Sequence, residues 1–371
     1  MTALPDRDES ARIGSLDGLR AIAILLVMLS HFVTGVDPNR GLRSIAYKVI
    51  VNGWCGVDLF FVLSGFLITG ILIRARESKD RFRNFYARRT LRIFPLYYLA
   101  LLIVFLIVPA VAGGCPPVPS REQMPYWLYI ANFRLRDVAS PCSNVGHFWS
   151  LAIEEQYYAV WPAVVFLLTP RNAKRACIAI IAASVLFRIA LVMQHAQWRA
   201  FYWTPSRADA LSCGSLIAFL MTTEQGRAAV RKWSWPLFII AGAITAALMW
   251  KNRLETIFSA DESMATLVAR VGVPFLLAAL FAAFVGLALT RPVAARVLDN
   301  PPFRFLARYS YGLYVWHMFV IYPAHLLMPS GPVWPRAIAE LAATLIAATL
   351  SYHLFEERFL ALKRYFPQRH S

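Results

Sequence analysis

The sequence predicts an all-helical integral membrane protein that crosses the bilayer many times. Hydrophobic residues make up 58% of the 371 residues and charged residues only 16%, against roughly a quarter charged in ordinary soluble domains. Apolar runs of about 20 residues, the length that a helix needs to cross a hydrocarbon core of about 30 Å, recur along the whole chain. A soluble fold cannot bury so much apolar surface, so we expect a polytopic helical bundle.

Ten apolar runs are predicted to form the membrane spans, because charged residues and Gly/Pro clusters bound each of them. They lie at 18–36, 55–73, 94–113, 149–168, 176–194, 207–222, 235–250, 266–290, 310–328 and 335–354. The first run follows a polar start and lacks a small-x-small cleavage site, which predicts a retained helix and not a signal peptide. A shorter run at 126–133 cannot span and is predicted to form a re-entrant or interfacial helix.

One membrane domain is predicted to use the whole chain, 1–371, with polar tails at 1–15 and 355–371. The sequence shows no internal repeat of the kind found in many secondary transporters, and no appended soluble domain. Its formal charge of +17 comes from Lys and Arg residues between the apolar runs, most of them on the side of the N-terminus. This bias predicts cytoplasmic termini and contacts with membrane lipids, and gives no reason to expect a nucleic-acid partner.

The five cysteines are too few and too scattered for a disulfide framework or a metal cluster, so we expect no bound metal. Only Cys115 and Cys142 share a polar loop, which the predicted orientation places outside the cell. In an oxidising compartment the two could pair. A disulfide and two unconnected thiols both remain open.

Arg20 and His31 lie on one face of the first predicted helix. They are about three turns, or about 16 Å, apart along its axis. Ionisable residues are costly inside a bilayer, so each is a candidate for function. A neutral imidazole at this depth can take a proton from a hydroxyl, as a general base does. The alternative is a histidine that hydrogen-bonds a neighbouring helix for packing.

Arginines concentrate in a predicted cytoplasmic loop at 74–92. Most of them are explained as topology signals. Arg88, Arg89 and Arg92 are different, because they come directly before a span. Since Arg89 and Arg92 are about one helical turn apart, they are suited to hold a phosphate-bearing polyanion beside Arg20 through charge-assisted contacts.

Acidic residues open three of the predicted spans near the opposite membrane face. They are Asp58, Glu154, Glu155 and Asp209. The alternative to a functional role is a set of buried ion pairs with Arg207 or Arg188, which are weak evidence for function. Ser64 is predicted to serve close helix packing and not to act as a nucleophile. His317 is predicted to be structural.

Six segments, in this order and at these spacings, resemble the membrane acyltransferase family called acyltransferase 3, which includes bacterial O-acetyltransferases of lipopolysaccharide and other glycans. They are LDGLRAIAILLVMLSH at 16–31, GVDLFFVLSGFLIT at 56–69, FYARRTLRIFPLYY at 85–98, HFWSLAIEEQYYAVWP at 147–162, RADALSCG at 207–214 and YSYGLYVWH at 309–317. The resemblance implies a protein of the bacterial inner membrane that transfers a short acyl group from acyl-CoA to a hydroxyl of a glycan or another carbohydrate-containing acceptor.

The resemblance also assigns roles. It makes Arg20 and His31 the essential pair of the first helix, and it places Glu154 at the family's acidic motif. The residues expected to bind CoA are Arg20, Arg88, Arg89 and Arg92. The residues expected to bind the acceptor are Asp58, Trp149, Gln156 and Asp209. The final span departs from the family pattern, because Arg358 stands where a proline often follows the Glu356 motif, and this weakens any role for Glu356.

These features combine into one predicted mechanism. The CoA phosphates bind the arginines at the cytoplasmic mouth, and the pantetheine arm runs along the first helix until the thioester reaches His31. His31 then deprotonates the acceptor hydroxyl, or briefly accepts the acyl group, while Glu154 orients the imidazole and Arg20 completes the catalytic set. Acyl-CoA is a substrate here, and no permanently bound cofactor is expected.

Two other classes of protein remain as alternatives. A proton-coupled transporter or exporter would use membrane-embedded Arg, His and Glu as an ion relay, but the missing repeat and the basic inner mouth argue against it. A structural membrane subunit would leave the buried charges unexplained. The sequence leaves open the acceptor, the acyl group (acetyl, succinyl or another), the face from which the acceptor enters and the oligomeric state.

Overall fold

The described part of the chain folds into an all-helical bundle. The computed structural model describes residues 14–33, 50–111, 115–134, 144–251, 263–328 and 333–367. The first half of the bundle contains α1 (Gly14–Phe32), η1 (Asn52–Cys55), α3 (Gly56–Arg74), α4 (Arg81–Leu102), the π-helix η2 (Ile103–Ile107), α5 (Val108–Val111), α6 (Ser120–Trp127), η3 (Ala131–Phe133), η5 (Gly146–Phe148) and α7 (Trp149–Leu167). The second half contains α8 (Pro170–Met193), α9 (Gln197–Tyr202), α10 (Thr204–Leu220), α11 (Glu224–Lys251), α12 (Met264–Thr290), α13 (Pro292–Leu298), α14 (Pro301–Trp316), α15 (Ile321–Leu327), α16 (Val333–Ser351), the π-helix η7 (Tyr352–Glu356), α17 (Glu357–Ala361) and η8 (Leu362–Tyr365).

Seven of the described helical stretches are long and apolar enough to cross a membrane. They are Gly14–Phe32, Asn52–Arg74, Arg81–Val111, Pro170–Met193, Glu224–Met249, Met264–Thr290 and Val333–Tyr365. The remaining predicted spans correspond to α7, to α10 and to the pair α14 and α15, which a turn interrupts. The multi-pass helical architecture is therefore confirmed, while the count of ten spans remains a prediction.

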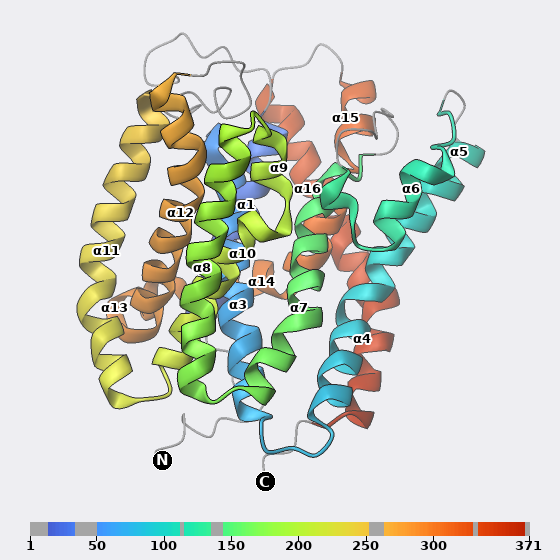
Figure 1. The fold of residues 1–371 in the computed structure, drawn as a ribbon. Coiled ribbons are helices and arrows are strands. Elements are labelled where there is room, and N and C mark those ends of the chain that lie inside the picture. The colour runs from blue at the N-terminus through green and yellow to red at the C-terminus, as the bar shows by residue number, and fades with distance from the viewer. Residues whose placement is uncertain are drawn as a thin grey trace.

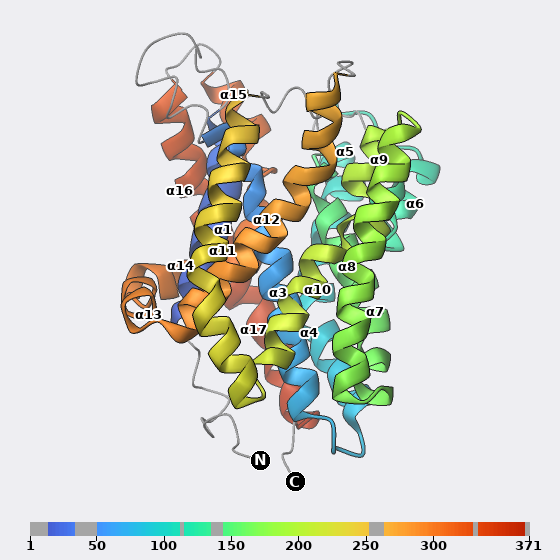
Figure 2. The same cartoon turned by 60° about the vertical axis from the view of Figure 1, so that its left-hand side comes forward.

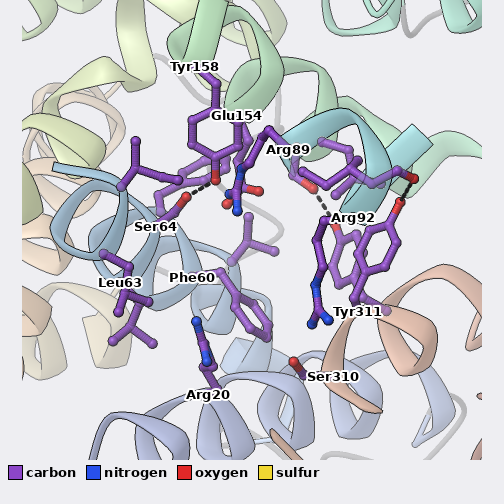
Figure 3. Close-up of a pocket in the computed structure, with 18 of the residues that line it drawn as sticks. Arg20, Phe60, Leu63, Ser64, Arg89, Arg92, Glu154, Tyr158, Ser310 and Tyr311 are labelled. Carbon is purple, nitrogen blue, oxygen red and sulfur yellow. Dashed lines mark hydrogen bonds between the residues drawn. The ribbon is translucent and has the colours of Figure 1, made fainter. Parts of the chain in front are cut away.

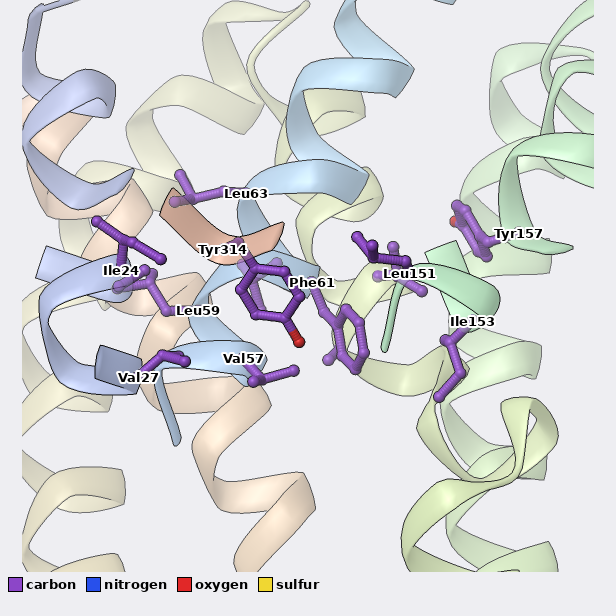
Figure 4. Close-up of a cluster of buried hydrophobic side chains, with 14 of the residues drawn as sticks. Ile24, Val27, Val57, Leu59, Phe61, Leu63, Leu151, Ile153, Tyr157 and Tyr314 are labelled. Carbon is purple, nitrogen blue, oxygen red and sulfur yellow. The ribbon is translucent and has the colours of Figure 1, made fainter. Parts of the chain in front are cut away.

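Helix α3 occupies the centre of the bundle and contacts α1, α7, α10 and α12 (Figure 1). Its apolar side chains interleave with those of α1 and α7, as Val57, Leu59 and Phe61 show beside Val27 and Leu151 (Figure 4). Helices α11 and α12 pack against each other at one side of the molecule, as both views show (Figure 2). The outward face of α11 carries exposed large apolar residues, as a lipid-facing helix does.

One prediction about a chain segment is corrected. The predicted loop 74–92 is largely helical, because α3 ends at Arg74 and α4 already begins at Arg81. Arginine is a good helix former. A prediction from hydropathy treats a charged segment as a loop, and it therefore places the start of α4 too late in the sequence. The predicted tail from 355 is also helical as far as η8, and it packs on α4, where Arg88 donates hydrogen bonds to the carbonyls of Lys363 and Phe366 at 3.3 and 3.2 Å.

The short run at 126–133 contains the end of α6 and all of η3, and both helices are too short to span. Tyr97 and Tyr98 of α4 donate hydrogen bonds to the carbonyls of Tyr126 and Trp127 at 2.7 and 3.1 Å. The segment is thus fixed to α4 at the end of the bundle that also carries α9 and α15 (Figure 1).

The α3–α10 contact depends on two facing glycines. A Cβ on Gly65 would overlap the carbonyl oxygen of Leu211, and one on Gly214 would overlap that of Val62. Gly214→Ala is therefore expected to lower the free energy of unfolding by about 1–3 kcal/mol through overpacking. Thermal unfolding in detergent checks this, with Gly70→Ala as the control, since the nearest atom to a Cβ there is Arg74 Nη1 at 3.5 Å. Equal stability of the two variants would contradict the close approach.

Candidate active site

A cavity of about 210 Å³ lies between α1, α3, α4, α7 and α14 (Figure 3). One wall is the apolar face of α3, which contributes Phe60, Leu63 and Leu67. The charged and hydroxyl groups that line the cavity include Arg20, Ser64, Arg89, Arg92, Glu154 and Tyr158. Three guanidinium groups and one carboxylate make this an electropositive chamber inside a bundle of apolar helices.

The three arginines enter the cavity from two helices. In Figure 3 they surround Phe60, with Arg20 coming from α1 and with Arg89 and Arg92 coming from successive turns of α4. Asp17, one turn before Arg20, accepts a hydrogen bond from its Nη1 at 3.2 Å. The sequence predicted that these arginines lie beside one another, and the structure brings them into one chamber.

Arg89 lies at the most polar part of the cavity. Its guanidinium carbon lies 4.1 Å from the centroid of the Tyr158 ring, within cation–π range. Glu154 and Glu155 interact with it electrostatically. Its Nε is buried and has no hydrogen-bond partner among the described residues.

Glu154 lies between the arginines and two hydroxyl groups. The Ser64 and Tyr158 hydroxyls form a hydrogen bond with each other, and both interact with the Glu154 carboxylate. Glu154 was predicted to orient His31, but its recorded contacts in the described part of the chain are with this group and with Arg89 and Arg20. The structure therefore places Glu154 among the cavity arginines and the Ser64 and Tyr158 hydroxyls.

Arg92 faces a second acid. Glu356, in the last turn of η7, is buried and interacts electrostatically with Arg92. Ser351 donates a hydrogen bond to Glu356 Oε1 at 3.2 Å, and the Tyr311 hydroxyl holds α14 on α4 through the carbonyl of Ile93 at 2.7 Å. The departure from the family pattern weakened any role for Glu356, yet the fold brings this residue against Arg92.

His31 lies in the last turn of α1, outside the set of side chains that line the cavity. Its Nδ1 donates a hydrogen bond to the carbonyl of Val27 at 2.8 Å. Its ring centroid is 5.1 Å from that of His317, which is 4.9 Å from that of His147. Burial, and to a smaller extent the charge of a protonated His31, lower the pKa of His147 to about 3. The described side chains include no group arranged to hold a metal ion.

Two residues that line the cavity also contact the histidines. Ser150 and Tyr314 line the cavity, and both hydroxyls donate hydrogen bonds to the carbonyl of His147, at 3.2 and 2.9 Å. The Tyr314 ring centroid is 5.4 Å from that of His317. Tyr314 therefore contacts both the cavity and the histidines.

The acids predicted to bind the acceptor lie in buried ion pairs. Asp58 pairs with Arg207 at 2.6 Å, and Asp209 pairs with Arg188 at 2.5 Å, with all four side chains at most 2% exposed. This is the alternative that the sequence left open. None of the four is among the residues that line the cavity.

Three other predicted site residues make structural contacts. Trp149 packs against Phe61 of α3 at 6.0 Å between ring centroids. Gln156 donates hydrogen bonds to the carbonyl of Tyr129 and to Asn132 Oδ1 at 2.7 and 2.9 Å. Arg88 holds the C-terminal segment, as described above.

Tyr158, Tyr314 and His147 were not singled out from the sequence. A signal for Tyr158 was present, because it lies four residues after Glu154 and so on the same helix face. Tyr314 and His147 gave no comparable signal, since their neighbours come from distant parts of the chain.

Comparison with known proteins identifies the family of this chain. The sequence matches the acyltransferase domain family, acyltransferase 3, over residues 13–354. It is 29% identical to a peptidoglycan O-acetyltransferase of Listeria monocytogenes, with 93% of this chain and 55% of that protein covered. It is 28% identical to a putative peptidoglycan O-acetyltransferase of Bacillus subtilis, with 93% and 54% covered.

A putative O-acetyltransferase of Staphylococcus aureus is 27% identical, with 94% of this chain and 57% of that protein covered. The chain thus spans about half the length of these curated relatives. No solved structure matches it. Because the family match extends over nearly the whole chain, the chain belongs to the acyltransferase 3 family.

Proposed function

We propose that this protein is a membrane O-acyltransferase that moves an acetyl group from acetyl-CoA to a hydroxyl of a carbohydrate. The family match and the O-acetyltransferase relatives support acyl transfer as the reaction. The observation that carries the choice of donor is the cavity with its three arginines. CoA is a polyanion with an uncharged arm, and the cavity offers guanidinium groups beside an apolar wall.

The arginines suit CoA phosphates for two reasons. Guanidinium groups bind phosphate oxygens through paired, charge-assisted hydrogen bonds. The buried Nε of Arg89 lacks a partner among the described residues, and an unsatisfied buried donor is costly unless a ligand satisfies it. The apolar face of α3 then takes the pantetheine arm toward Tyr314 and His31.

His31 is proposed as the base that activates the acceptor hydroxyl. Since a carbonyl only accepts hydrogen bonds, the bond to Val27 fixes the proton on Nδ1 and leaves Nε2 with its lone pair. The acceptor O–H bond breaks as Nε2 takes the proton, the oxygen attacks the thioester carbonyl, and the C–S bond breaks. The leaving CoA thiolate takes up the proton. Peptidoglycan is the first acceptor to test, because two relatives are named for it.

The proposed topology has ten spans and cytoplasmic termini in the inner membrane. Two observations support the orientation. Cys115 is disulfide-bonded, as residues in an oxidising exterior are, while Cys142 lies outside the described residues. The turn at 75–80 is at the opposite end of the bundle from α6, which follows Cys115 (Figure 1).

Transfer of radiolabelled acetyl from acetyl-CoA tests the function. Purified protein is incubated with peptidoglycan fragments and, separately, with lipid-linked sugars, and each acceptor is analysed for label. We expect label in an alkali-labile ester on carbohydrate. Gradient-driven flux in vesicles without label transfer would instead support the transporter alternative.

Arg89→Ala is expected to raise the KM for acetyl-CoA by about 10- to 100-fold and to lower kcat much less. The reason is that the contact lies far from the reacting carbon and is worth about 1.5–3 kcal/mol as a charged hydrogen bond. Steady-state kinetics with varied donor measures the change. Arg83→Ala is the matched control on α4, because the Arg83 side chain is 65% exposed. An unchanged KM for Arg89→Ala would remove Arg89 from the donor site.

A further inference from the structure

The cluster His31, His317 and His147 brings together three chain segments that are far apart in sequence. His31 ends α1, His317 follows α14 and His147 lies in η5. Two of the rings are nearly inaccessible, since His317 is 0% and His147 6% exposed. Packing alone would favour apolar rings at such positions, because an imidazole carries two polar atoms that need partners.

Backbone carbonyls fix the tautomer of each ring. His317 Nδ1 donates to the carbonyl of Tyr314 at 2.6 Å, and His147 Nε2 donates to that of Val315 at 3.2 Å. The other nitrogen of each neutral ring is therefore an unprotonated acceptor. His317 Nε2 and His147 Nδ1 are buried and have no hydrogen-bond partner in the described part of the chain. The cluster thus keeps acceptors unsatisfied beside the imidazole proposed as the base.

From this geometry we propose that His317 is a second proton-accepting group, which shares with His31 the proton taken from the substrate hydroxyl. His147 packs against the His317 ring. The inference rests on the proposed function of His31. The His31 and His317 rings pack with their centroids 5.1 Å apart. While His31 is neutral, Nε2 of each ring carries only a lone pair, so no hydrogen bond can form between these two atoms. Once Nε2 of His31 has taken the proton, it becomes a donor, and Nε2 of His317 accepts a hydrogen bond from it.

The proton balance of the reaction stays the same. One proton leaves the acceptor oxygen, resides on the His31–His317 pair while the new ester C–O bond forms, and passes to the CoA thiolate as the C–S bond breaks. His317 thus stabilises the imidazolium without contacting either substrate, so it is a positioning residue. In the described residues, the charged groups that interact with His317 are His147 and His31, and Tyr314 packs beside it.

His317→Gln tests the shared proton, because an amide cannot take up a proton. The pH dependence of kcat is measured with saturating acetyl-CoA and acceptor. We expect kcat to fall at least 10-fold, and the acidic limb of the profile to move to lower pH by about one to two units. The reason is that an amide oxygen accepts a hydrogen bond from protonated His31 more weakly than an imidazole nitrogen does and cannot take the proton, so protonated His31 is less stabilised. The KM for acetyl-CoA should stay unchanged. His325→Gln is the control, because His325 is on α15 outside the cluster and its side chain is 43% exposed.

The outcomes separate this inference from the proposed function. If His317→Gln keeps the wild-type profile, or shifts its acidic limb to higher pH, the shared proton is excluded while His31 can still be the base. If His31→Ala retains transfer, the proposed base itself fails. If His317→Gln does not fold, the pH dependence of kcat is measured for His147→Gln instead. A shift of its acidic limb to lower pH supports the shared proton, and an unchanged limb or a shift to higher pH excludes it. A further check is the dependence of the wild-type kcat on the fraction of D₂O in the solvent. A linear dependence would mean that only one proton moves, and it would contradict the shared proton.

Discussion

Asp58→Ala is expected to destabilise the fold by about 3–5 kcal/mol, which is the cost of leaving a buried charge without its partner. Arg207 is 1% exposed, and its Nη2 donates to Asp58 Oδ1 at 2.6 Å. Its guanidinium also lies over the rings of Phe61 and Phe201, at 5.8 and 5.0 Å from the centroids. Without Asp58, this cation stays enclosed between aromatic rings, far from water.

Thermal unfolding of detergent-purified protein measures the loss. Asp80→Ala is the matched control, because Asp80 forms an exposed pair with Arg83 at 4.0 Å and exposed pairs contribute about 0–1 kcal/mol. The double variant Asp58→Ala with Arg207→Met should regain much of the stability, since a paired charge replaced by apolar groups is often tolerated. If the single variant is as stable as the control, the pair does not hold α3 to α10.

The ion pair between Arg188 and Asp209 shows why such contacts cannot be predicted from the sequence. Arg188 of α8 bonds Asp209 of α10 and also donates to the carbonyls of Ser206 and Val271, which joins α8, α10 and α12. The sequence placed these charges in or beside spans and left ion pairing open. It could not choose partners, because which helix faces which depends on packing over the whole bundle.

Much of the fold could be predicted, since hydropathy directly reports helices of membrane length. Its errors fall where charge interrupts a helix, as at Arg81 in the first turn of α4. Hydropathy also joined α14 and α15, although a turn separates Trp316 from Ile321. The apolar run continues through that turn, so composition gives no sign of the break.

The candidate site was partly predictable, because spacing along a helix indicates which residues share a face. This placed Arg89 and Arg92 together, and it placed Arg20 and His31 on one face about three turns apart along the helix axis. Contacts between helices could not be derived in this way. Glu154 was therefore assigned to His31, whereas the fold places it beside Ser64, and nothing in the sequence joined His31 to His317.

His31→Ala is expected to lower the rate of acetyl transfer by about 10²- to 10⁴-fold, which is the usual contribution of a general base. Donor binding should persist, because the cavity arginines are unchanged, so the KM or Kd for acetyl-CoA should stay near the wild-type value. His31 is near the end of α1 and makes one recorded side-chain hydrogen bond, to Val27. Unfolding is therefore a minor contribution, and thermal stability in detergent verifies it.

The same variant also separates two roles that His31 can have. If His31 is a base, His31→Ala slows transfer to every hydroxyl acceptor, and no acyl-protein accumulates in the wild type when the acceptor is omitted. If His31 carries the acyl group, the wild type incubated with labelled acetyl-CoA alone retains label that His31→Ala does not. The Nε2 lone pair serves either chemistry, but only a His31 protonated at Nε2 could donate a hydrogen bond to His317, because an acylated Nε2 carries no proton. Normal transfer by His31→Ala would exclude both roles, and the cluster of His31, His317 and His147 would then have only a packing role.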